Sequence, residues 1–115
     1  MNDKSIEILF LQQAEDFLDK IEKPVRKKFF VSFHKTKSRI FGEWFKKMSS
    51  TDNLFEFRVD YMGRFYRLFA FWDSRDLRQT LVVCTHGLIK KSKRTPKHDI
   101  KKAEEIKANY FEGLR

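Results

Sequence analysis

Two arginines and one histidine are the residues of this 115-residue chain best suited to chemistry on a phosphate diester. The guanidinium groups of Arg58 and Arg67 each present a planar fork of N–H donors that matches phosphate oxygens. An unperturbed histidine such as His86 titrates at about pH 6.5, so it can give or take a proton near neutrality. Metal-free cleavage of RNA by its own 2′-OH needs both charge stabilisation and proton transfer. Arg58, Arg67 and His86 are therefore candidate catalytic residues, and a packed, hydrogen-bonded role is the alternative for His86.

A run of positive charge follows His86. Residues 90–102 contain seven Lys or Arg against the single acid Asp99, so they carry +6 of the chain's net +9. Charge concentrated in this way is typical of a surface that binds a polyanion such as RNA. Each lysine taken singly is equally well explained as a solvated charge. The candidate RNA-binding residues are Lys90, Lys91, Lys93, Arg94 and Lys97 from this run, with Arg64 from the segment before it.

Arg58 and Arg67 are expected to face each other across a hairpin. If Met62-Gly63 forms a two-residue turn, the two arginines stand opposite on the same face of adjacent strands. Like charges in that position repel, so either a carboxylate or a bound phosphate should offset them. Glu56 lies on the same face and is the candidate orienting residue. Arginines on either side would lower its pKa, which argues against Glu56 as a base.

Other chemistries find little support in the sequence. One cysteine and three scattered histidines do not form a zinc-ligand pattern, so no metal site is predicted. Cys84 lies in an apolar run and is expected to be buried. Phe65, Tyr61 and Tyr66 could stack on a base, although core packing explains these rings as well.

The hydrophobic pattern predicts an α+β protein with the order β-α-α-β-β-β-α, in which an antiparallel meander sheet packs against helices. The expected strands are Ser5–Phe10, Leu54–Tyr61, Phe65–Trp72 and Thr80–Ile89. The expected helices are Leu11–Ile21, one that begins near Pro24, and one with its N-cap and first turn at Thr95-Pro96. The segment Phe41–Ser50 is expected to be irregular, because Gly42 interrupts the helical pattern.

Residues 1–115 are expected to form a single domain, since this length suits one core. No apolar run approaches the roughly 20 residues of a membrane span, and Met1-Asn2-Asp3-Lys4 lacks a signal-peptide pattern. We therefore expect a cytoplasmic protein that is not bound to a membrane.

Three linked motifs resemble the HigB/RelE superfamily of bacterial type II toxins, specifically its phage-derived HigB-like branch. They are Leu54–Arg58, Tyr66–Leu68 and His86–Pro96, and they stand in the order that the family shows. The sequence departs from the pattern at Leu88, where Phe is usual, and at Arg94, inserted before Thr95-Pro96.

The resemblance implies a RelE-like fold and the toxin component of a toxin–antitoxin system. It implies an endoribonuclease that cleaves mRNA, ribosome-bound in many members, through attack by the 2′-OH and without metal or cofactor. The implied partners are mRNA, the ribosome and a helix-turn-helix antitoxin protein. Two alternatives on the same fold remain: a non-catalytic RNA- or ribosome-binding module, and a protein-interaction domain whose basic face docks an acidic partner.

Overall fold

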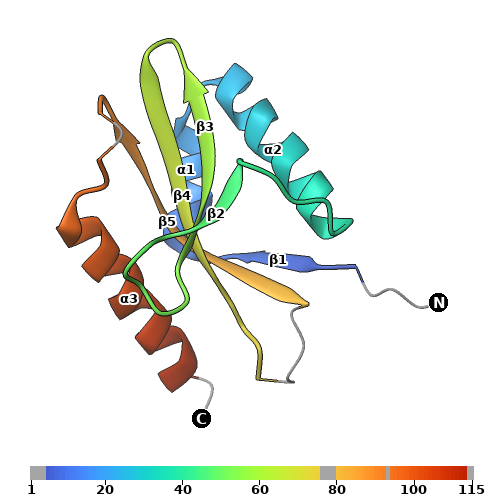
Figure 1. Ribbon diagram of the computed structural model, residues 1–115, viewed down its shortest axis with the longest axis vertical. Helices are drawn as coiled ribbons and strands as arrows, with labels where there is room; N and C mark the ends of the chain where they lie inside the picture. The colour runs from blue at the N-terminus through green and yellow to red at the C-terminus, as the bar shows by residue number, and fades with distance from the viewer. Residues whose placement is uncertain (1–4, 76–79, 93, 114–115) are drawn as a thin grey trace.

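The computed structural model describes residues 5–75, 80–92 and 94–113. Within these ranges, five strands form one sheet and three helices pack on it (Figure 1). In chain order the elements are β1 (Glu7–Phe10), α1 (Gln12–Lys20), α2 (Lys23–Lys37), β2 (Phe45–Lys47), β3 (Phe55–Tyr61), β4 (Arg64–Trp72), β5 (Leu81–Lys90) and α3 (Lys97–Glu112). The α+β class and the predicted order of seven elements are confirmed, with β2 as an addition.

The sheet is mixed, and the predicted antiparallel meander is confirmed as three of its strands, β3, β4 and β5. Its strand order is β1-β5-β4-β3-β2, and β1 runs parallel to β5 while the other pairs are antiparallel. The short β2 lies within the segment that was expected to be irregular. Only Phe45 of its three residues is buried, so the sequence lacks the alternation of apolar and polar residues from which a strand is predicted.

The two faces of the sheet have separate apolar cores. On one face, α1 and α2 cover a cluster that includes Phe57, Val59 and Leu68. On the other face, α3 packs through Ala103 against Phe69, Phe71 and Val83. Figure 1 shows α2 and α3 on opposite sides of the sheet. The second core fills only part of its face, which leaves the remainder to charged side chains.

The β3–β4 hairpin places those charged side chains. Its turn is made by Met62 and Gly63, both with positive φ (51° and 76°), as a two-residue hairpin of matching twist requires. In the resulting register Arg58 is paired with Arg67, as the sequence predicted. Glu56, Arg58 and Asp60 of β3 therefore share a face with Arg67 of β4.

The start of α3 differs from the expectation. Its N-cap is Pro96, without a side-chain cap, and the helix begins at Lys97. Thr95 was predicted to cap the helix, but its hydroxyl accepts a hydrogen bond from Lys90 instead. Among the described residues, no helix is both long and apolar enough to cross a lipid bilayer.

Candidate nucleic-acid interface

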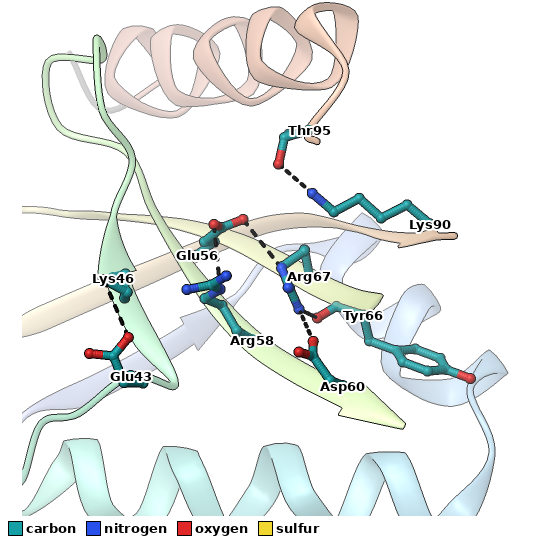
Figure 2. Close-up of polar contacts among 9 residues, drawn as sticks. All are labelled: Glu43, Lys46, Glu56, Arg58, Asp60, Tyr66, Arg67, Lys90 and Thr95. Carbon is teal, nitrogen blue, oxygen red and sulfur yellow. Dashed lines mark hydrogen bonds and ion pairs between the residues drawn. The ribbon is translucent and has the colours of Figure 1, made fainter. Parts of the chain in front are cut away.

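Five charged residues, here called the charged cluster, gather on the sheet face beside α3: Glu56, Arg58, Asp60, Arg67 and Lys90. They come from β3, β4 and β5, and Figure 2 shows the Glu56 carboxylate between the two guanidinium groups. Three cations and two carboxylates leave a net charge of +1 in the cluster. This arrangement brings together four residues that the sequence marked for the site, and adds Asp60.

Arg67 is enclosed and fixed. Its side chain is 1% exposed, and Nη1 donates to Asp60 Oδ1 at 2.8 Å and to the Tyr66 carbonyl at 2.9 Å. Its Nε lies 3.8 Å from Glu56 Oε1, which is an ion pair without a hydrogen bond. Sequence reasoning did not identify Asp60 as a partner of Arg67. The predicted hairpin register places Asp60 diagonally opposite Arg67, and this position could have indicated the ion pair.

Arg58 is the more accessible arginine. Its side chain is 29% exposed, and its Nε lies 3.8 Å from Glu56 Oε2. Within the described part of the chain, three buried donors of the arginines have no hydrogen-bond partner: Arg58 Nε, Arg67 Nε and Arg67 Nη2. Buried donors are normally satisfied. Glu56 Oε1 is also buried without a hydrogen-bond partner, so the carboxylate and the two Nε groups face one another at ion-pair distance without hydrogen bonds.

A cleft of about 370 Å³ opens at Arg58. It is lined by Lys46, Lys47, Met48, Ser49, Glu56, Arg58, Thr95 and Ile100. A second hollow of about 300 Å³ is lined by Glu43, Trp44, Arg58 and Asp60. Arg58 thus contributes to both open spaces. The sequence did not mark Lys46 and Lys47 for this site, because β2 itself was not foreseen.

Lys90 closes the cluster near α3. It is buried, and its Nζ donates to Thr95 Oγ1 at 2.7 Å (Figure 2). Burial lowers the pKa of Lys90; nearby Arg67 and Arg58 lower it further, while Glu56 and Asp60 act in the opposite direction. A lysine with a lowered pKa gives up its proton more readily than a solvated one.

His86 lies on the same face but beneath α3. It is 2% exposed, its ring is 4.7 Å from that of Phe69, and Nε2 lies 3.3 Å from Asp99 Oδ1. A register shift brings it there, because β4 pairs Leu68 with Gly87 but Ala70 with Cys84, which leaves one extra residue in β5. Burial lowers the pKa of His86, although its bond to Asp99 opposes that shift. A catalytic role for His86 stays a prediction.

The other sequence candidates lie mostly at the surface. Arg64, Lys91, Arg94 and Lys97 are exposed, while Lys93 falls outside the described residues. Tyr66 belongs to the core, and its hydroxyl donates to Glu22 of the α1–α2 junction. Tyr61 packs against the same core. Phe65 is half-buried, with the Arg67 guanidinium 5.6 Å from its ring centre.

Metal chemistry gains no support from the described ranges. Across residues 5–75, 80–92 and 94–113, no group of three or more His, Cys, Asp or Glu side chains could hold a metal ion. Cys84 is fully buried, and burial raises the pKa of its thiol, which disfavours the reactive thiolate.

Comparisons with known proteins point to one family and one fold. The family model described as phage-derived Gp49-like protein matches residues 16–108. No curated protein sequence matches the chain. The structure is similar to a doubly substituted Escherichia coli toxin RelE in the free state, with 13% identity and a TM-score of 0.58 over 96% of this chain and 99% of that one.

Two toxin–antitoxin complexes contain a similar chain. The Escherichia coli RelBE complex matches with 14% identity and a TM-score of 0.55, over 78% of this chain and 100% of the other. The RelBE2 complex of Mycobacterium tuberculosis matches with 19% identity and a TM-score of 0.51, over 79% and 98%. At these identities the matches show the fold, and they confirm the RelE-like architecture that the motifs implied.

Proposed function

Because the chain belongs to the phage-derived Gp49-like family, we propose that it is the toxin of a type II toxin–antitoxin system. The family match and the RelE-like fold bear out the resemblance indicated by the three sequence motifs. The RelBE structures are complexes of a toxin with its antitoxin, which supports an antitoxin partner for this chain as well. A helix-turn-helix architecture for that antitoxin is part of the proposal and comes from the resemblance.

The proposed activity is metal-independent cleavage of mRNA, carried out on ribosome-bound message. The observation that supports it most is the guanidinium group of Arg58, which is 29% exposed and lines an open cleft together with Lys46 and Lys47. In this reaction the 2′-oxygen attacks the adjacent phosphorus, and the bond from phosphorus to the 5′-oxygen breaks. The products are a 2′,3′-cyclic phosphate and a 5′-hydroxyl end. Preorganised cations stabilise the charge that develops on the phosphate oxygens.

Each member of the charged cluster has a distinct role in this proposal. Arg58 contacts the phosphate, because it is the more accessible arginine of the charged cluster and lines both hollows. Arg67 is fixed by Asp60, and Glu56 orients both guanidinium groups. Lys90, with its lowered pKa, exchanges a proton with the reacting oxygens.

The outer cations hold the rest of the RNA. Lys46 and Lys47 line the cleft, and Lys91, Arg94, Lys97 and Arg64 are exposed. We assign His86 to catalysis only in a state in which α3 has moved away from the sheet. In the present state His86 is covered, and its contact with Asp99 fastens α3 to β5.

Mapping RNA 5′ ends after induction of the protein in bacteria tests the proposal. We expect new 5′-hydroxyl ends within coding regions for the wild type, and at least about tenfold fewer for Arg58→Gln, which keeps a polar side chain without the charge. Lys28→Gln is the matched control, because it neutralises an exposed cation of α2 on the other side of the sheet. Equal cleavage by Arg58→Gln would overturn the assignment of Arg58.

A non-catalytic RNA- or ribosome-binding module is the second candidate function. It is favoured by the enclosure of Arg67 and His86, since neither side chain reaches solvent in this state. The same experiment separates the two functions. Growth arrest with RNA or ribosome binding that depends on Arg58, but without new RNA ends, would establish the binding module instead of the nuclease.

A further inference from the structure

The outer surface of α2 carries an apolar groove on the other side of the sheet from the charged cluster. Phe30 and Val31 are each 50% exposed, which is unusual for large apolar side chains at the centre of a helix face. They lie in a groove of about 440 Å³ lined by Lys23, Arg26, Lys27, Phe30, Val31, His34 and Lys35. We call these seven residues the α2 groove.

The positions of these residues form one continuous stripe. Lys23, Lys27, Phe30 or Val31, and His34 follow one another at helical spacing along α2. The whole helix, residues 23–37, contains six Lys or Arg and no acidic residue. Besides His34, the polar residues that line the groove are therefore the cations Lys23, Arg26, Lys27 and Lys35.

Both ends of the groove are held in place. Arg26 donates from Nε to the Leu18 carbonyl at 2.7 Å and from Nη2 to the carbonyls of Asp19 and Ile21 at 2.9 and 3.2 Å. Near the other end, Lys35 Nζ lies 5.0 Å from the centre of the Trp44 ring. The Phe30 ring packs edge-on against Phe33, at 5.7 Å between centres. A surface fixed in this way loses little side-chain entropy when a partner binds.

We propose that the α2 groove binds an acidic amphipathic helix of a protein partner. The apolar face of that helix would cover Phe30 and Val31, and its carboxylates would meet Lys23, Lys27 and the other cations of the rim. RNA fits less well, because phosphates gain from the lysines but not from an exposed valine and phenylalanine. Since α2 and the charged cluster lie on opposite faces of the sheet, such a partner would leave the cleft at Arg58 open.

The test uses the full-length protein labelled with ¹⁵N and a panel of three synthetic peptides of about five helical turns. The peptides carry Leu, Ile or Phe on one stripe and Glu beside it, and each has a scrambled version of the same composition. Amide shifts locate the peptide, and fluorescence anisotropy gives its Kd. A single-stranded RNA of matched charge is titrated in parallel, and no step requires the protein to cleave RNA.

We expect at least one peptide to bind with a micromolar Kd and to shift amides of α2, while the scrambled versions do not. Val31→Ala should weaken this binding about threefold to tenfold without changing RNA affinity, because it removes only apolar contact. Lys27→Glu should weaken it more than Lys28→Glu does. Lys28 is the matched control, since it is the neighbouring exposed lysine and lies outside the groove.

Three outcomes would overturn the inference. The first is the absence of α2 shifts with every peptide. The second is equal loss of peptide binding for Lys27→Glu and Lys28→Glu, which would indicate unspecific attraction between charges. The third is RNA binding at the α2 groove that competes with the peptide, which would make this surface a nucleic-acid contact.

Discussion

Replacement of Glu56 by Gln should destabilise the fold and at the same time strengthen binding of phosphate. The Glu56 carboxylate lies 3.8 Å from both Arg58 and Arg67. Without its charge, the two arginines paired across the hairpin repel each other, and Asp60 is then the one carboxylate left in the charged cluster, among the described residues, to compensate. A phosphate ion placed between the guanidinium groups would restore the missing negative charge.

The magnitude follows from the geometry of the two ion pairs. Breaking a fully buried pair costs about 3–5 kcal/mol. Both separations here exceed hydrogen-bond length, and the side chain of Arg58 is 29% exposed, so part of the charge is screened. We therefore expect the free energy of unfolding to fall by about 2 kcal/mol, which lowers Tm by about 8 °C for a domain of this size.

Thermal unfolding in phosphate and in chloride, at matched ionic strength, measures both effects. Phosphate at roughly ten times its Kd should raise the free energy of unfolding of Glu56→Gln by about 1.4 kcal/mol. The wild type should gain less, because Glu56 already occupies the position between the arginines. Glu15→Gln is the control, because Glu15 is exposed on α1 on the other side of the sheet; this variant should respond to phosphate as the wild type does.

Two results would refute this reasoning. An unchanged Tm for Glu56→Gln would mean that Glu56 does not hold the arginines. Equal stabilisation by phosphate of Glu56→Gln, Glu15→Gln and the wild type would mean that phosphate binds elsewhere on the protein.

Three further predictions concern other parts of the molecule. Because burial lowers the pKa of His86, the unfolded state binds more protons than the folded state, so the free energy of unfolding should fall as pH drops from 7 to 5. In urea unfolding, His86→Gln should reduce the slope of the free energy of unfolding against pH by up to about 1.4 kcal/mol per pH unit. An unchanged slope would contradict this prediction. Gly87→Ala should cost about 1–3 kcal/mol in the same assay, since its Cβ would lie 2.1 Å from the Phe17 ring; a neutral effect would place Phe17 elsewhere. The double change Lys46→Ala and Lys47→Ala should make the binding of single-stranded RNA less dependent on salt, with the slope of log association constant against log salt concentration smaller in magnitude by about 1.4. An unaltered slope would exclude both lysines from the interface.

The sequence was most informative where structure is local. The hairpin register that sets Arg58 against Arg67 followed from alternation and one two-residue turn, and the structure has that register. The repulsion it implied also pointed to Glu56, which lies between the two arginines. These inferences needed only neighbouring strands, where side-chain direction is fixed by the pleat.

Features that depend on distant segments could not be foreseen. The parallel pairing of β1 with β5 joins residues more than seventy positions apart, as Glu7 with Leu81 shows. His86 is buried because α3 packs over it, whereas the sequence predicted a histidine at the accessible end of a strand. Thr95 resembled an N-cap locally, but Lys90 takes its hydroxyl as an acceptor.

The most direct test of the central claim is the ¹H–¹⁵N spectrum of the arginine side chains during titration with a short RNA methylated at every 2′-oxygen. Methylation removes the nucleophile, so the RNA binds without being cleaved. Both Nε–H groups lack a hydrogen-bond partner among the described residues and lie 3.8 Å from Glu56. The account predicts that their signals, in Arg58 and in Arg67, shift together and saturate with one Kd. Shifts confined to surface lysines, with both Nε–H signals unchanged, would contradict it.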